Sequence, residues 1–143
     1  MDKTFVWQQS GREYLELHLS IDSDQIQSVK MKAIGCLSFL ALSQQMKAKL
    51  MGPVAALSLP EGHDHSTLIW REIILQIKDL WKVPIEHKEL CHCRKVDTEI
   101  VDRAVVYGAH NVETIRRRTS ANTGCGTCKE DVEKVINNRL KTS

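Results

Sequence analysis

The amino-acid sequence predicts an α+β fold, in which an antiparallel β-hairpin with helices is followed by a small all-helical unit. Three observations lead to this prediction. Apolar and polar residues alternate from Tyr14 to Ile21, the apolar period becomes helical directly after Gly35, and helical patterns fill the chain beyond Cys91. The 143 residues are enough for one domain, or for one domain with a small second one.

The first predicted element is an antiparallel hairpin with one buried face. Four aliphatic residues point to one side of its first strand, namely Leu15, Leu17, Leu19 and Ile21. The segment Asp22-Ser23-Asp24 has the composition of a turn. A second strand over residues 26–34 directs Val29, Met31 and Ala33 to one face. We also expect a short strand over residues 4–8.

Two helices are expected after the hairpin. Residues 37–51 form an amphipathic helix that Gly52-Pro53 ends. A second helix, capped by Ser66 or Thr67 and ended by Pro84, has apolar residues spaced i, i+3, i+4 and i+7. These residues are Trp70, Ile73, Ile74, Ile77, Leu80 and Trp81, and we interpret both tryptophans as core residues. A short polar linker follows, so the predicted domains are 1–84 and 85–143.

Three shorter helices are expected in the second domain. The first begins at Asp97 or Thr98 and ends before Gly108, and the second begins at an Asn111 cap. The third covers residues 127–140, with Val132, Val135, Ile136 and Leu140 facing inward. The segment from Cys91 onward is so short that its apolar core alone would give only marginal stability. Domains of this size are commonly stabilised by a bound metal.

Four cysteines in this segment form two close pairs. Cys91 and Cys93 make a C-x-C motif, and Cys125 and Cys128 make a C-x-x-C motif after 31 intervening residues. Two pairs of thiolates can surround one centre, and iron–sulfur clusters and structural zinc both use all-cysteine ligands. Gly124 and Gly126 flank the second pair and allow backbone amides to approach the sulfurs. We favour an iron–sulfur cluster; zinc, disulfides and unliganded thiols are the alternatives.

The segment Leu90–Leu140 resembles the bacterioferritin-associated ferredoxin-like (BFD-like) [2Fe-2S] domain, which also forms the middle of the scaffold protein NifU. The resemblance includes the cysteine spacing, the Val96-Asp97 start and the G-C-G-x-C ending. It implies a small all-helical fold in which Cys91, Cys93, Cys125 and Cys128 bind a permanent [2Fe-2S] cluster.

The run from Gly11 to Met46 is similar to the NifU/IscU-type scaffold domain, on which new clusters are built. The hairpin, the Gly35-Cys36 turn and the helix after it correspond to elements of that domain. The family places cysteine, glycine and aspartate before the first long strand, where this chain has Ser10, Gly11 and Arg12. The family's third cysteine is also missing before Cys91. Since serine and arginine do not replace a thiolate and a carboxylate, we predict a degenerate scaffold domain.

Two further sets of residues are candidate functional groups. Cys36 is interpreted either as a small buried residue or as a thiol at a helix N-terminus that retains a role in sulfur acceptance or redox sensing. The loop His63-Asp64-His65 has the composition of a metal chelate, although such loops are usually just solvated.

These observations indicate a non-enzymatic [2Fe-2S] protein that transfers electrons or assists iron–sulfur assembly and iron metabolism. The alternative is an interaction or regulatory module with structural zinc at the same four cysteines. The net charge of +2 is too small to suggest nucleic acid, and no apolar run is long enough for a membrane. We expect a cytoplasmic location, where thiols stay reduced, and a redox or iron–sulfur assembly protein as partner. The family resemblance also suggests a homodimer by analogy.

Overall fold

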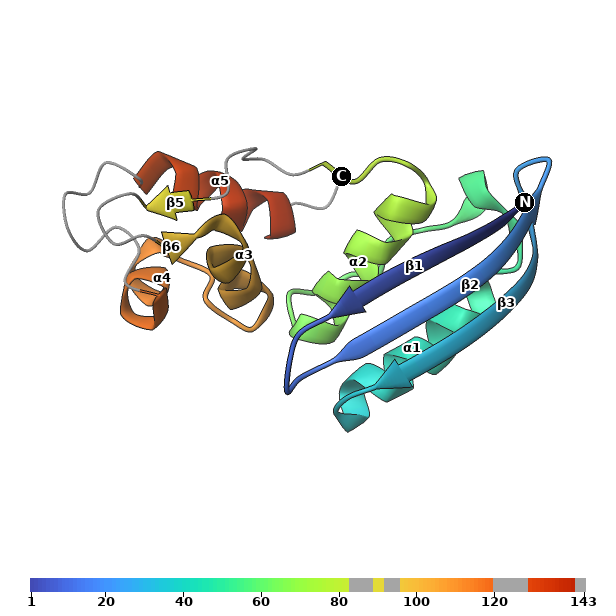
Figure 1. Ribbon diagram of the computed structural model, residues 1–143, viewed down its shortest axis with the longest axis horizontal. Coiled ribbons are helices and arrows are strands. Elements are labelled where there is room, and N and C mark those ends of the chain that lie inside the picture. Colours follow the sequence, from blue (N-terminus) through green and yellow to red (C-terminus); the bar gives the residue numbers. More distant parts are fainter. Residues whose placement is uncertain (83–88, 92–95, 120–128, 141–143) are drawn as a thin grey trace. The chain divides into compact units, whose positions relative to one another are not determined.

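Figure 1 shows the computed structural model, which describes residues 1–82, 89–91, 96–119 and 129–140. The chain divides into two compact units, Met1–Gly62 with Ile69–Trp81 and His63–Leu68 with Lys82–Ser143. The helix α2 (His65–Ile77) includes residues of both units. The predicted boundary at residue 84 lies outside the described residues.

The first unit contains a four-stranded antiparallel sheet in the order β1-β2-β3-β4. Its strands are β1 (Asp2–Gln8), β2 (Tyr14–Asp22), β3 (Gln25–Ile34) and the two-residue β4 (Gly52–Pro53), after which Val54–Ala56 forms one 3₁₀ turn. The predicted hairpin is confirmed, and so is the N-terminal strand, which begins two residues earlier than expected. The antiparallel topology agrees with the predicted α+β class.

The turn predicted between β2 and β3 is confirmed. Ser23 and Asp24 both have positive φ angles, 49° and 60°, and Asp22 pairs with Gln25 across them. Two consecutive left-handed residues make a type I′ turn, whose twist matches that of the flanking strands. The hairpin register is therefore set locally.

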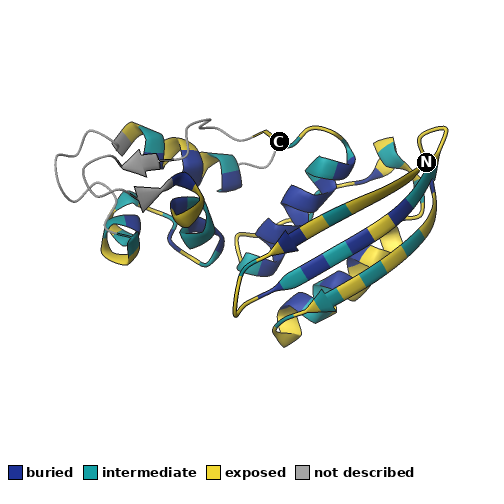
Figure 2. Ribbon diagram, viewed as in Figure 1, coloured by how far each residue is buried: buried dark blue, intermediate teal, exposed yellow. Residues whose placement is uncertain are grey.

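One face of the sheet forms the core, as the alternation predicts. Leu15, Leu17 and Leu19 are at most 1% exposed, whereas His18 on the opposite face is exposed (Figure 2). The helices α1 (Leu37–Lys49) and α2 supply the apolar side chains of the second layer. Phe39 comes from α1, and a run of buried residues comes from α2, namely Leu68, Ile69, Trp70, Ile73, Ile74 and Ile77.

Buried hydrogen bonds fix α2 within this layer. The indole nitrogen of Trp70 donates to the hydroxyl of Ser43 on α1 at 2.9 Å. The indole nitrogen of Trp7 on β1 donates to the carboxylate of Glu72 at 3.2 Å. Since buried polar groups need partners, these bonds specify how α2 lies against α1 and β1. Trp70 is a core residue, as predicted.

Both ends of α2 differ from the prediction. Asp64, rather than Ser66 or Thr67, is the cap, since its carboxylate accepts hydrogen bonds from the hydroxyl and the amide of Thr67. Burial raises the pKa of Asp64, but these bonds outweigh it, so the pKa lies below its usual value. The helix ends at Ile77, because Asp79 has a φ of 59° and the amide of Leu80 bonds to the carbonyl of Leu75.

The second unit contains a short ribbon and three helices. The strands β5 (Glu89–Cys91) and β6 (Val96–Asp97) pair in antiparallel fashion, followed by α3 (Thr98–Val106), α4 (Val112–Thr119) and α5 (Lys129–Leu140). The three helices are confirmed. The prediction of an all-helical unit is wrong in one respect, because it omits the ribbon. Strands of two or three residues carry too little periodicity to be detected.

Local signals set the ends of α3 and α4. Gly108 has a φ of 109°, and its amide donates to the carbonyl of Val105, which closes α3 as predicted. The side-chain oxygen of Asn111 accepts a hydrogen bond from the amide of Thr114 at 2.8 Å, which confirms the predicted cap of α4. Among the described residues, no helix has the length and apolarity needed to cross a bilayer.

Candidate metal centre

Cys91 is the one predicted ligand among the described residues. Cys91 is the last residue of β5 and pairs with Val96 of β6. Cys93 falls between these strands, and Cys125 and Cys128 fall between α4 and α5; these three residues lie outside the described part of the chain. The convergence of the four sulfurs therefore stays a prediction.

The described elements form the framework that flanks the two cysteine pairs in the sequence. The helix α3 contacts β5 and β6 on the one hand and α4 and α5 on the other. Cys91 ends β5, and Lys129, the residue after Cys128, begins α5. Both pairs thus flank elements that pack on the same helix, which is consistent with ligands drawn from two distant stretches of sequence.

This framework has a small aliphatic core. Its buried residues come from α3, α4, α5 and the connection after α3, and they are Val101, Val105, Ala109, Ile115, Val132, Val135 and Ile136. The three inward positions that are buried on α5 are those predicted from the sequence, and Leu140 packs partly against the same cluster. Short side chains bury little apolar area each, so this core contributes modestly to the free energy of folding.

An ion pair connects α3 to α5 beside that core. The guanidinium of Arg139 donates two hydrogen bonds to the carboxylate of Asp102, at 2.7 and 2.6 Å. Arg139 is 3% exposed, so the pair is largely withdrawn from solvent. A bidentate pair in such a position fixes the orientation of two helices strongly. It joins the C-terminal end of α5 to α3.

The donor set fits an iron–sulfur centre. Four thiols in two pairs supply two sulfur ligands for each iron of a [2Fe-2S] cluster. Basic residues of α4 also suit a centre that carries net negative charge; among them, Arg117 and Arg118 are exposed, and Arg118 donates to the carbonyl of Tyr107. The described residues therefore contain nothing that opposes the predicted cofactor.

Comparison with protein-family models adds an independent observation. Residues 90–138 match the model of the BFD-like [2Fe-2S] binding domain. The match indicates an iron–sulfur domain at these residues. The match encloses Cys91, Cys93, Cys125 and Cys128 and covers α3, α4 and most of α5. The [2Fe-2S] cluster predicted from the sequence is the cofactor that this type of domain binds.

The comparisons do not extend this result to the remainder of the chain. The family match begins at residue 90, and the scaffold-type resemblance of the N-terminal half is not supported by a family match. Searches among curated proteins and among solved structures found no match. The NifU/IscU-like interpretation of residues 1–84 consequently stays a prediction.

The remnants of the predicted scaffold site lie at two turns of the first unit. Ser10, Gly11 and Arg12 belong to the turn between β1 and β2, where the amide of Arg12 donates to the carbonyl of Gln9. Cys36 is the N-cap residue of α1. The interpretation of Cys36 as a buried residue is wrong, because Cys36 is exposed.

Glu13 is a residue near Cys36 that sequence reasoning missed. Its side chain is 4% exposed, and its carboxylate accepts a hydrogen bond from the amide of Cys36 at 3.2 Å. A carboxylate directly before a strand is expected to face solvent. Its burial results from the approach of α1, 23 residues later, and no local pattern encodes that approach.

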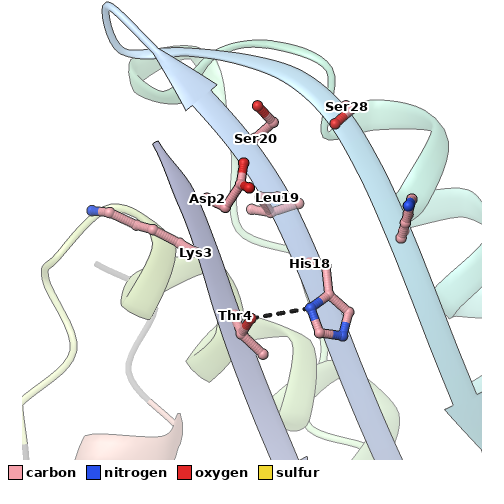
Figure 3. Close-up of a pocket in the computed structure, with 8 residues that line it drawn as sticks. Asp2, Lys3, Thr4, His18, Leu19, Ser20 and Ser28 are labelled. Atoms are coloured by element: carbon pink, nitrogen blue, oxygen red, sulfur yellow. Dashed lines mark hydrogen bonds between the residues drawn. The ribbon is translucent and has the colours of Figure 1, made fainter.

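The outer face of the sheet contains a shallow depression of about 420 Å³ (Figure 3). Within it, the hydroxyl of Thr4 lies 3.0 Å from Nδ1 of His18, and Nε2 of His18 lies 2.9 Å from the carboxylate of Glu16. The hydroxyl of Tyr14 donates to the same carboxylate at 2.7 Å. These polar groups satisfy one another along β2 and, through Thr4, across to β1, which accounts for them as surface pairs.

Proposed function

We propose that the protein is a non-enzymatic [2Fe-2S] protein that transfers single electrons or assists iron–sulfur assembly and iron metabolism. The observation that carries this proposal is the match of residues 90–138 to a [2Fe-2S] binding domain that includes all four predicted ligands. We propose a cytoplasmic location, because paired thiols need a reducing compartment to remain available as ligands.

In this proposal the chain supplies ligands, charge and a rigid support. Cys91, Cys93, Cys125 and Cys128 would hold the cluster. Amides next to Gly124 and Gly126 would adjust its reduction potential by donating to the sulfurs. When bound, a [2Fe-2S] cluster supplies one-electron redox chemistry. Because C-x-C and C-x-x-C loops are near-surface features, a docked redox or assembly partner is within reach.

For the first unit we propose a scaffold-like platform without its assembly site. The support is the order of elements, in which the β2–β3 hairpin leads through Gly35 and Cys36 into α1. Ser10 and Arg12 lie in the turn where the scaffold family has a thiolate and a carboxylate. A platform of this kind presents a docking surface and leaves the electron-carrying role to the second unit.

An absorption spectrum of the anaerobically purified full-length chain tests the cofactor. We expect sulfide-to-iron charge-transfer bands in the visible region that bleach on addition of dithionite. A Cys125→Ser variant loses these bands, because a hydroxyl is a poor ligand for iron in such a cluster. A Cys36→Ser variant keeps them, since Cys36 lies outside the matched domain.

A colourless protein that contains zinc contradicts this proposal. That result favours the alternative function, an interaction module in which the same four cysteines hold a structural metal. Equal loss of colour in the Cys36→Ser and Cys125→Ser variants also contradicts it, because the ligands then extend beyond the second unit.

A further inference from the structure

The sheet of the first unit ends in a strand with a free edge. β1 is the outermost strand, and among the described residues β2 alone pairs with it (Figure 1). The register between them runs without a bulge from Asp2 to Gln8. The seven residues of β1 include neither proline nor glycine, so nothing in the sequence interrupts the far side of the strand. Amides and carbonyls on such an edge can pair with another strand.

Two reciprocal hydrogen bonds show which residues of β1 face this edge. The ammonium group of Met1 donates to the carbonyl of Ile21 at 3.0 Å, and the amide of Ile21 donates to the carbonyl of Met1 at 2.9 Å. At the other end, the amide of Gln9 donates to the carbonyl of Glu13. Since bonded pairs alternate along an antiparallel ladder, the odd-numbered residues of β1 bond to β2. The residues that direct their backbone groups away from the sheet are Asp2, Thr4, Val6 and Gln8.

The opposite edge of the sheet is protected. β4 pairs with Gln25 and Ile26 of β3, and Lys30 and Lys32 are exposed along the remainder of β3. A short covering strand and exposed lysines are devices that prevent a sheet edge from pairing with another sheet. β1 contains one lysine, Lys3 near its start, and its middle residues are uncharged. The edge of β1 is therefore the one that is open to a further strand.

We propose that β1 pairs with β1 of a second copy of this chain, in antiparallel fashion about a two-fold axis at Phe5. In this register Thr4 of one copy lies opposite Val6 of the other, and Asp2 lies opposite Gln8. All outward-facing amides and carbonyls of the strand are then paired. Registers centred on Thr4 or Val6 pair only residues 2–6 or 4–8 of the strand. Two four-stranded sheets thus form one continuous sheet.

The side chains favour the same register. No like charges meet, since Asp2 faces Gln8 and Lys3 faces Trp7 across the axis. Phe5 is half-buried and pairs with Leu17, which places its ring on the core face of the sheet at the open edge. The two Phe5 rings become neighbours in a non-hydrogen-bonded pair, where side chains approach most closely. A second copy is the occupant that repeats both the backbone pattern and the ring by symmetry.

Sedimentation equilibrium of the full-length chain tests the proposal. One strand pair is smaller than a standard protein interface, so we expect a reversible dimer that dissociates on dilution. The weight-average mass should rise with concentration from that of one chain to that of two.

A proline substitution at the open edge identifies the interface. Because the amide of Val6 points away from β2, Val6→Pro removes no bond of the β1–β2 ladder but removes a donor at the centre of the dimer. We expect its dissociation constant to rise by about tenfold or more. Val6→Thr keeps the amide and the branched side chain, so this control leaves the dissociation constant unchanged. Circular dichroism confirms that both variants are folded.

Paired charges test the register. Thr4 and Val6 are exposed, so both positions accept charged side chains. Thr4→Lys combined with Val6→Lys places like charges opposite each other on both sides of the axis, and should abolish the dimer. Thr4→Glu combined with Val6→Lys places opposite charges at the same positions and should restore it.

Three results overturn the proposal. They are a single-chain mass at every concentration, which leaves the edge to an extended segment of another protein, a dimer that Val6→Pro does not weaken, and equal behaviour of the two double variants. The proposal is independent of the [2Fe-2S] centre. Val6→Pro should leave the iron-dependent colour unchanged, so failure of the dimer and failure of the cluster are distinguishable.

Discussion

The two units of the chain differ in what fills their interiors. The first buries Trp7, Phe39 and Trp70 completely, together with the leucines of β2. Among the described residues after Lys82, the buried apolar side chains are all alanine, valine or isoleucine. Large aromatic side chains bury much more area each than short aliphatic ones. We infer that the first unit folds by its own core, whereas the second depends on its metal centre.

Removal of the cluster gives the largest expected effect and separates the units most clearly. In Cys125→Ser, we expect amide protection to be lost throughout α3, α4 and α5 and to persist in β1–β3. Structural metal centres contribute on the order of 10 kcal/mol to the folding of small domains, more than a short aliphatic core supplies. Hydrogen exchange followed by mass spectrometry measures this. Unchanged protection in α3–α5 contradicts the idea of a metal-dependent unit.

A cavity in the core of the first unit is expected to have the next largest effect. This effect should be confined to the first unit. Leu17 is fully buried and pairs with Phe5 and Met31 on the neighbouring strands. Leu17→Ala should lower the free energy of unfolding of the first unit by about 3–4 kcal/mol. Urea denaturation followed by tryptophan fluorescence measures the change, with Val6→Ala, at a 45% exposed position of β1, as the control.

The visible spectrum provides the second readout for Leu17→Ala. Because the cluster belongs to the other unit, its absorption should be the same as in the unaltered chain. A loss of colour in parallel with the loss of stability would show that the two units fold as one.

Loss of the ion pair between α3 and α5 is expected to destabilise the second unit alone. Arg139→Ala leaves the Asp102 carboxylate without its bidentate partner and should cost about 3 kcal/mol. The measurement is the temperature at which the visible absorbance disappears. Arg117→Ala, at an exposed position of α4, should leave that temperature within experimental error. If both variants behave alike, the pair is not what holds α5 in place.

The smallest expected effect concerns a titration on the outer face of the sheet. Hydrogen bonds from His18 and then from Tyr14 hold the pKa of Glu16 below its usual value. A depressed pKa stabilises the fold above the unfolded pKa, and this contribution is lost as the pH falls through the folded pKa. We expect a weak effect, because the site is exposed.

Carboxyl-carbon NMR titration measures the pKa of Glu16 directly. His18→Ala and Tyr14→Phe should each raise it toward the ordinary value, and His63→Ala should not change it. A Glu16 pKa that both substitutions leave unaltered rules out this origin of the shift.

The sequence predicts the parts of this molecule that have strong local signals. Alternation in β2, the left-handed turn at Ser23, the cap at Asn111 and the stop at Gly108 all depend on residues within one or two turns of each other. The family match at residues 90–138 supports the prediction of a [2Fe-2S] domain, which was made from the spacing of four cysteines.

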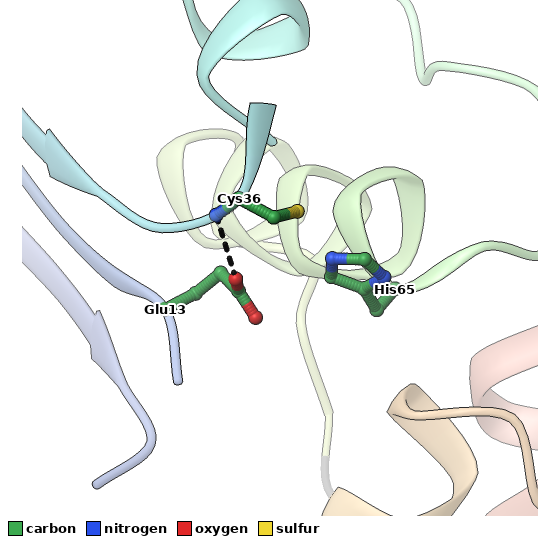
Figure 4. Close-up of side chains that lie close together, drawn as sticks. All are labelled: Glu13, Cys36 and His65. Carbon is green, nitrogen blue, oxygen red and sulfur yellow. Dashed lines mark hydrogen bonds between the residues drawn. The ribbon is translucent and has the colours of Figure 1, made fainter. Parts of the chain in front are cut away.

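The features that the sequence did not predict depend on contacts between distant segments. The apolar spacing of Leu80 and Trp81 continues the period of α2, yet a left-handed Asp79 ends the helix first. Glu13 is buried because the start of α1 returns to it (Figure 4). Local propensity contains no information on that approach.

The iron and acid-labile sulfide content of the anaerobically purified, full-length chain tests the central claim most directly. Two irons and two sulfides per chain, both lost in Cys125→Ser and both retained in Cys36→Ser, are the result that a [2Fe-2S] domain at residues 90–138 predicts. Stoichiometric zinc without sulfide in the unaltered chain would contradict it.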